Sequence, residues 1–173
     1  MLHNAGFITS SIVGIAMALY CFLNNPNRTA NVTLALTMLA ITTFCISHLF
    51  GVNATDGIQS RNILMFNISI IYTSIFNLHC VLALLGKDKQ KKSFLFVMYI
   101  VAFALTIFYL VWPDFFLHTS IPKMYFPNYY VAGEYHWIMR AIFNVLIPIY
   151  FLSELVSSYS EAKDEIEKNR IWY

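Results

Sequence analysis

Charged residues are scarce in this chain of 173 amino acids: only 12% are Asp, Glu, Lys or Arg, whereas an ordinary soluble domain has about 25%. The few charges are clustered between long apolar runs, and the first four of these runs contain no charged residue. This distribution argues against a soluble domain and favours a membrane protein. Five runs can be marked: 5–23, 32–50, 63–85, 94–112 and 137–156.

Each of these runs is long enough to cross a lipid bilayer, because a spanning helix needs roughly 20 apolar residues. A spanning segment must satisfy its own backbone hydrogen bonds inside the hydrocarbon, so each run should be helical. The sequence therefore predicts an all-α integral membrane protein with a bundle of five transmembrane helices. Residues 1–158 form its single helical domain.

Motifs for soluble catalysis are missing. The chain has no phosphate-binding Gly-rich loop, no dinucleotide fingerprint, no nucleophile elbow and no zinc-protease helix. Its three cysteines all fall inside predicted helices, without disulfide or metal-ligand spacing. We therefore predict no enzymatic activity, no cofactor and no metal.

The basic residues indicate the orientation. An excess of Lys and Arg marks the cytoplasmic side, which predicts an outer N-terminus, an inner C-terminal tail and a multi-pass location in the cell membrane. The segment KDKQKK is then a membrane-topology signal, and no nucleic-acid partner is expected. Eight of the eleven basic residues lie on the predicted inner side: Arg28, Lys87, Lys89, Lys91, Lys92, Lys163, Lys168 and Arg170.

An aromatic connector, IPKMYFPNYYVAGEYHW, separates the fourth and fifth runs. Its β-favouring residues predict a short outer hairpin with strands over Thr119–Met124 and Tyr129–Ala132. The dipeptide Pro127-Asn128 is the expected turn. Two roles remain open: a lid whose tyrosines rest in the headgroup layer, or one wall of a ligand pocket.

Arg140 is the clearest ionisable residue at membrane depth. His136, Arg140 and Asn144 are spaced four apart and share one helix face, while Pro148 can kink the same helix. One hypothesis is a polar face that binds an anion or pairs Arg140 with Glu134 or Asp114; the other is that Arg140 snorkels to the outer interface. The candidate ligand-binding residues are Tyr125, Tyr129, Tyr130, Glu134, His136, Arg140 and Asn144.

Other polar residues carry weaker signals. Four histidines are expected near the outer side, where imidazoles can sense pH, although no pair has the four-residue spacing of helical metal ligands. Asn67 and Asn77 either bind helices together or line a cavity. We expect Thr29 or Asn31 to cap the second helix, and Ser60 or Asp56 the third. The four histidines are His3, His48, His118 and His136.

The tail, residues 159–173, predicts a cytoplasmic helix that continues the fifth span. Leu155, Tyr159, Ala162 and Ile166 form one apolar stripe. The closing KNRIWY combines basic and aromatic residues, as found where a chain enters a membrane. It predicts the start of a sixth span, or an amphipathic end on the inner surface.

The segments ALYCFLNNPNRTANVTLALTMLAITTFCISHLF and GEYHWIMRAIFNVLIPIYFLSELVSSYSEAKDEIEKNRIWY resemble the N-terminal seven-transmembrane region of bacterial membrane sensor histidine kinases. The shared features are an Asn-Pro turn after the first helix, an aromatic outer hairpin ending in Gly133, and basic residues before a next helix. In other proteins the same region precedes diguanylate cyclases. The resemblance implies the first five of seven helices and no catalytic domain in this chain.

Two functions follow as hypotheses. The first is a membrane signal-input module that passes an unknown small-molecule or physical signal to a cytoplasmic output, such as a histidine kinase. Its partners would be the lipid bilayer and a cytoplasmic output domain or a second copy in a homodimer. The alternative is a small transport or channel subunit with a polar path along the fifth helix.

Overall fold

Five helices are long and apolar enough to cross a membrane in the part of the chain that the structure describes. The structure is a computed structural model that describes residues 2–162, 165, 168 and 169. The elements, in chain order, are α1 (Leu2–Asn24), α2 (Thr29–Asn53), α3 (Gly57–Leu64), η1 (Met65–Ile68), α4 (Ser69–Leu84), α5 (Lys92–Val111), η2 (Pro113–Phe115), β1 (Leu117–Lys123), β2 (Phe126–Ala132), α6 (His136–Met139), η3 (Arg140–Leu146) and α7 (Ile147–Glu161).

The predicted five-helix architecture is confirmed, with two composite spans. Helices α3, η1 and α4 form one continuous span, and α6, η3 and α7 form another. The third span begins six residues before the predicted residue 63, because the Asp56 carboxylate accepts a hydrogen bond from the Gln59 amide and caps a polar first turn. The predicted side-chain cap on α2 is wrong: Arg28 is the N-cap residue and makes no side-chain cap bond.

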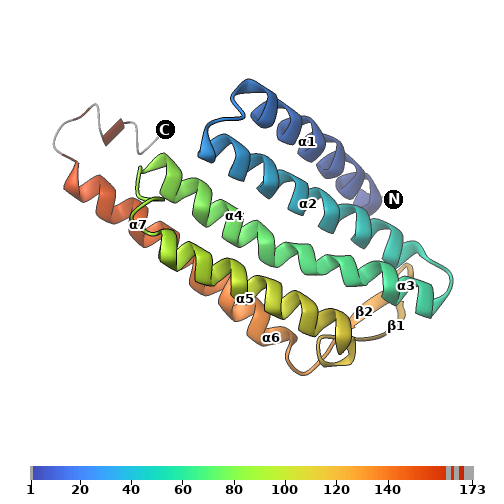
Figure 1. Cartoon of the computed structure of the whole chain (residues 1–173). Helices are drawn as coiled ribbons and strands as arrows, with labels where there is room; N and C mark the ends of the chain where they lie inside the picture. Colours follow the sequence, from blue (N-terminus) through green and yellow to red (C-terminus); the bar gives the residue numbers. More distant parts are fainter. Residues whose placement is uncertain (1, 163–164, 166–167, 170–173) are drawn as a thin grey trace.

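The helices lie antiparallel, with α1, α2, α4 and α5 side by side in that order (Figure 1). Helix α7 packs on α4. The apolar core runs along α4, where Ile71, Ile75, Leu78 and Leu82 are almost fully buried. Phe143 of η3 joins this core and is completely buried.

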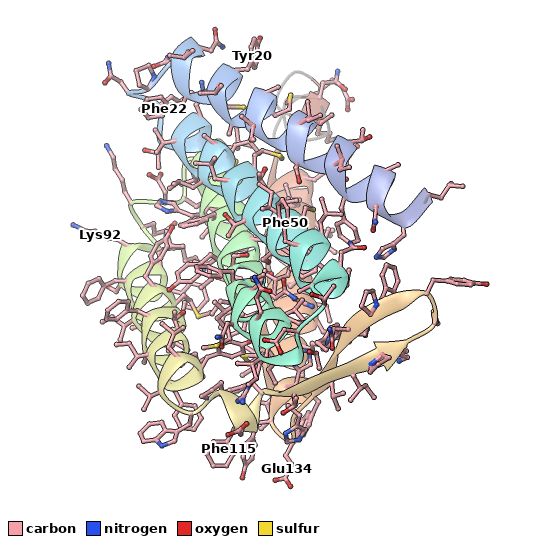
Figure 2. All side chains as sticks on the ribbon, turned by 90° about the vertical axis from the view of Figure 1, so that its right-hand side faces the viewer. Tyr20, Phe22, Phe50, Lys92, Phe115 and Glu134 are labelled. Carbon is pink, nitrogen blue, oxygen red and sulfur yellow. The ribbon has the colours of Figure 1, made fainter. Side chains whose placement is uncertain are left out.

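The outer surfaces of the bundle are apolar. On α5, Phe96, Phe103 and Leu110 are each more than half exposed. Figure 2 likewise shows Tyr20 and Phe22 of α1 projecting outward. Such a surface would aggregate in water, whereas it matches the hydrocarbon interior of a bilayer.

The predicted hairpin is present, but its turn is elsewhere. Strands β1 and β2 are antiparallel, with Leu117 opposite Ala132 and Lys123 opposite Phe126. The turn is at Met124, which has a positive φ of 56°, and Tyr125. The predicted turn at Pro127-Asn128 is therefore wrong, as are the predicted strand limits.

Tertiary contacts explain the hairpin register. The buried Asn128 side chain donates a hydrogen bond of 2.8 Å to the Ala54 carbonyl, in the turn after α2. Ser120 of β1 donates to the Gly57 carbonyl at 3.0 Å. Pro127 is tolerated in β2 because both strands of a two-stranded sheet are edges.

The two ends of the bundle differ in the elements that they carry. The hairpin end carries Leu2, the turn between α2 and α3, the two strands and the start of α6. The lysine end carries the turn between α1 and α2, the segment Lys87–Lys92 and the end of α7 (Figure 1).

The predicted tail is described in part. Helix α7 continues the fifth span to Glu161, beyond the predicted limit at residue 156. The prediction that one helix continues through Ala162 is wrong, because Ala162 follows α7 in an extended conformation. Ile166 and residues 170–173 fall outside the described residues.

Candidate functional site

A cavity of about 390 Å³ opens at the hairpin end. Its volume lies in the range of small-molecule sites, roughly 300–1,000 Å³. Side chains from all five spans and from both strands form its wall. They are His3, Phe7, Phe44, His48, Leu64, Asn67, Ile68, Ile70, Ile71, Tyr109, Leu117, Tyr129, Tyr130, His136, Met139, Arg140 and Asn144.

Two irregular helical segments border this cavity. Asn67 and Ile68 belong to η1, which has tight 3₁₀ geometry in the middle of the third span. Arg140 and Asn144 belong to η3, which has wide π geometry in the fifth span. Mid-helix segments of both kinds are frequent at functional sites and hinges.

The π geometry of η3 stands just before Pro148. The Ile147 amide bonds to the Ile142 carbonyl, five residues back, and Pro148 has no amide hydrogen with which to restore the α pattern. Residues four apart stay on one side of a wide turn. His136, Arg140 and Asn144 therefore line the same cavity, so the prediction that they share a face is confirmed.

Arg140 reaches back to the hairpin. Its guanidinium donates a hydrogen bond of 2.6 Å to the Tyr130 hydroxyl. This direction is the usual one, because side chains on a helix point toward its N-terminus. The long arginine side chain thus connects the fifth span to β2.

The predicted pairing of Arg140 with Asp114 or Glu134 is wrong. Asp114 forms a salt bridge of 2.5 Å with Arg61 at the start of the third span. Glu134 is exposed and points away from the bundle (Figure 2). The guanidinium therefore has no carboxylate against it among the described residues.

Of the seven predicted site residues, five line the cavity and two do not. Tyr125 stands at the tip of the hairpin with 99% of its side chain exposed, and Glu134 lies in the connector before α6. Tyr129 and Tyr130 stack at 5.1 Å between ring centroids and face the cavity. Burial raises the pKa of the Tyr129 hydroxyl, which keeps this group protonated as a donor.

His48 is the main cavity residue that the predicted site lacked. Its side chain is only 4% exposed, and its Nδ1 atom has no hydrogen-bond partner among the described residues. Aromatic rings surround it: Phe7 at 4.8 Å, Phe44 at 5.6 Å and Tyr129 at 5.7 Å between centroids. His3 stands 5.9 Å from the same ring.

His136 lines the same cavity. It is only half-buried, however, and its ring also interacts with the backbone of Phe116. His118, which the sequence grouped with these residues, is exposed on β1. No group of His, Cys, Asp or Glu among the described residues has the arrangement of a metal site.

Asn67 combines the two roles that its sequence context left open. Its side-chain oxygen accepts a hydrogen bond of 2.6 Å from the Ser47 hydroxyl, which joins η1 to α2. The same residue lines the cavity. The polar wall is therefore anchored to the neighbouring span.

The lysine end has a second polar cluster, of a different kind. Glu154 of α7 binds Lys87 at 3.2 Å and Lys91 at 3.1 Å, and only 12% of its side chain is exposed. Lys91 also donates to the Tyr150 hydroxyl at 3.2 Å. The hydrogen bonds to Glu154 and Tyr150 raise the pKa of Lys91. These contacts fix the start of α5 against α7.

Comparison with family models, with curated proteins and with solved structures finds no match for this chain. The resemblance to the membrane region of sensor histidine kinases therefore stays a prediction from sequence. The candidate site is defined by its geometry alone.

Proposed function

We propose that this chain is a membrane-embedded signal-input module of the cell membrane, with its hairpin end outside and its lysine end in the cytoplasm. A cue received in the cavity changes the packing of the fifth span. That span carries the change to a cytoplasmic output, for which a histidine kinase is the proposed class. The proposed orientation follows the excess of basic residues at the lysine end.

The observation that carries this proposal is the path of the fifth span. Its first turns contribute His136, Arg140 and Asn144 to the cavity wall. Its far end holds Glu154 between Lys87 and Lys91. One continuous helical segment therefore contacts the cavity at one end of the bundle and the ion-pair cluster at the other.

The segment that joins the cavity to α7 has irregular helical geometry, which is frequent at hinges. The π turns of η3 line the cavity and lead directly into α7. A ligand shifts such an equilibrium only by its different affinity for two arrangements. Arg140 and Asn144 are part of η3, so a bound ligand would act on the irregular turns directly.

The buried core favours this function over the transport alternative. Beyond Ile71, which lines the cavity, α4 continues with Ile75, Leu78 and Leu82, each with no exposed surface. Phe143 of η3 is also fully buried. A polar path along the fifth helix would have to pass this apolar layer, in which charged solutes are costly.

Coupling between the two ends can be measured by spin-label distances. The full chain, with Cys21, Cys45 and Cys80 replaced by alanine, receives labels at Ser93→Cys on α5 and Ser160→Cys on α7. Both positions are exposed. We expect Arg140→Gln, in lipid nanodiscs, to shift the distance distribution between the labels.

Arg28→Gln is the matched control, because Arg28 is an exposed guanidinium at the lysine end that does not line the cavity. This variant should leave the distribution unchanged. Identical distributions for Arg140→Gln and the parent would contradict the coupling. Chloride flux through reconstituted liposomes that disappears in Arg140→Gln would support the transport alternative instead.

A further inference from the structure

We propose that the cavity binds a single-chain amphiphilic anion: a medium-length apolar chain with one anionic head group, of which a medium-chain carboxylate is the simplest form. The inference rests on the proposed function and names the class of its ligand. The head group would bind Arg140 and the Tyr130 hydroxyl. The chain would lie against the apolar wall that faces the core.

The sign of the head group follows from the charges in the wall. Arg140 carries a permanent positive charge, and the described cavity wall has no Asp or Glu. Asp114 is bound to Arg61, and Glu134 points away from the bundle (Figure 2). An anion would form an ion pair with Arg140, whereas a cation would be repelled.

An unpartnered polar atom indicates that the head group accepts hydrogen bonds. Buried polar atoms in proteins nearly always have a partner, yet Nδ1 of the 96%-buried His48 has none in the described residues. An imidazole presents an N–H donor from one of its nitrogens. A carboxylate has two acceptor oxygens, which suit several donors at once.

Much of the remaining wall is apolar. Leu64, Ile71 and Leu117 are almost fully buried around the cavity, and Met139 is 6% exposed. None of these side chains offers a hydrogen bond, so this part of the wall suits a hydrocarbon chain. The apolar wall and the cationic site together describe an amphiphile and not a small inorganic anion.

The volume of the cavity suits one short chain. If each heavy atom occupies about the 30 Å³ of a water molecule, the cavity of about 390 Å³ holds roughly thirteen heavy atoms. Octanoate has ten heavy atoms and fits. A phospholipid with two long chains is several times larger, so only part of it could enter.

The test measures saturable binding of radiolabelled octanoate to the full chain in phosphatidylcholine nanodiscs, with empty nanodiscs subtracted. The comparison ligands are 1-octanol and octylamine, which keep the chain and change the head. We expect octanoate to bind at least about tenfold more tightly than either, because hydrogen bonds to charged groups are the strong ones. Equal affinity for 1-octanol would overturn the inference.

Variants locate the head group. Arg140→Gln should weaken octanoate binding about tenfold and leave 1-octanol binding unchanged, which also shows that the cavity is intact. His48→Phe should weaken it by a smaller factor, about threefold, because one hydrogen bond is lost. Arg28→Gln, which removes an exposed guanidinium at the lysine end, should bind as the parent does. Unchanged octanoate affinity in Arg140→Gln would contradict the proposed site.

A further arm separates a free acid from a membrane lipid as the source of the anion. Nanodiscs that contain phosphatidylglycerol should bind octanoate as phosphatidylcholine nanodiscs do. Loss of octanoate binding there would show that an anionic lipid occupies the site, and would overturn the inference of a free single-chain ligand.

The failures of the two proposals can be told apart. If octanoate binds but neither octanoate nor Arg140→Gln changes the distance between labels at positions 93 and 160, the ligand class holds and the signalling role fails. If octanoate does not bind while Arg140→Gln still shifts that distance, the signalling role holds and the ligand class is wrong.

Discussion

The two ends of the bundle treat polar groups in opposite ways. At the lysine end, Glu154 is enclosed by two lysines and its carboxylate oxygens are both paired. At the hairpin end, the exposed Arg140 has only the Tyr130 hydroxyl as a side-chain partner among the described residues, and Nδ1 of the buried His48 has none there.

This difference distinguishes a structural contact from a candidate binding surface. A satisfied ion pair holds two elements in place, and breaking it leaves charges without partners. Unsatisfied groups around a cavity cost stability, and that cost is recovered when a ligand supplies the missing partners. The chain thus holds α5 and α7 together at one end and leaves room for a molecule at the other.

The largest effect is expected in the apolar layer between the two ends. The comparison requires that this layer separate the cavity from the ion-pair cluster. Phe143→Ala opens a hole in a completely buried position. We expect a loss of roughly 2–4 kcal/mol in unfolding free energy, somewhat below the range for soluble cores because lipid is itself apolar. Denaturation in mixed micelles measures it.

The control for this variant is Phe96→Ala on α5, where 64% of the side chain is exposed on the bundle surface. It removes the same atoms without opening an internal hole, so stability should change little. Equal losses for the two variants would show that Phe143 does not form a packed layer.

The ion-pair cluster should show an intermediate effect. Glu154→Gln leaves Lys87 and Lys91 without a carboxylate, and we expect Tm to fall by about 2–4 °C, a modest value because both lysines are partly exposed to solvent. High salt should reduce the difference by screening. Glu134→Gln, which changes an exposed carboxylate at the hairpin end, should leave Tm as it is.

The smallest effect is expected at the cavity, and its sign is reversed. His48→Phe removes an unpartnered polar atom from a ring of aromatic side chains, so Tm of the ligand-free protein should rise by about 1–2 °C. The exposed His118→Phe is the control and should have no effect. A clear fall in Tm for His48→Phe would mean that this imidazole is already satisfied, and the contrast between the ends would disappear.

The sequence predicted the five spans because length and scarcity of charge leave few alternatives for such runs. It also predicted a hairpin from the β-favouring aromatics around Pro122 and Pro127. The turn position escaped prediction because long-range contacts decide it. Asn128 was assigned to a turn on local preference, whereas its bond to the Ala54 carbonyl, 74 residues away, places it inside β2.

The candidate site was predictable only where its residues share one helix. His136, Arg140 and Asn144 could be grouped by their spacing. His3 and His48 lie on two other spans, and no spacing rule brings them to the same cavity. The sequence placed four histidines near one end, but only packing shows that three of them line the cavity and that His118 does not.

The wide turns of η3 have a geometric consequence for the far end of the fifth span. A π segment holds one residue more than the α-helix it interrupts, and each residue of an α-helix turns the chain by about 100° and advances it by about 1.5 Å. If Arg140–Leu146 tightened into α geometry, α7 would rotate about its own axis by that amount. Glu154 would then leave its lysines, and a different face of α7 would be presented to whatever lies beyond it. Tightening of η3 would therefore reach the far end of the fifth span as a rotation of α7, together with a shift of about 1.5 Å along its axis.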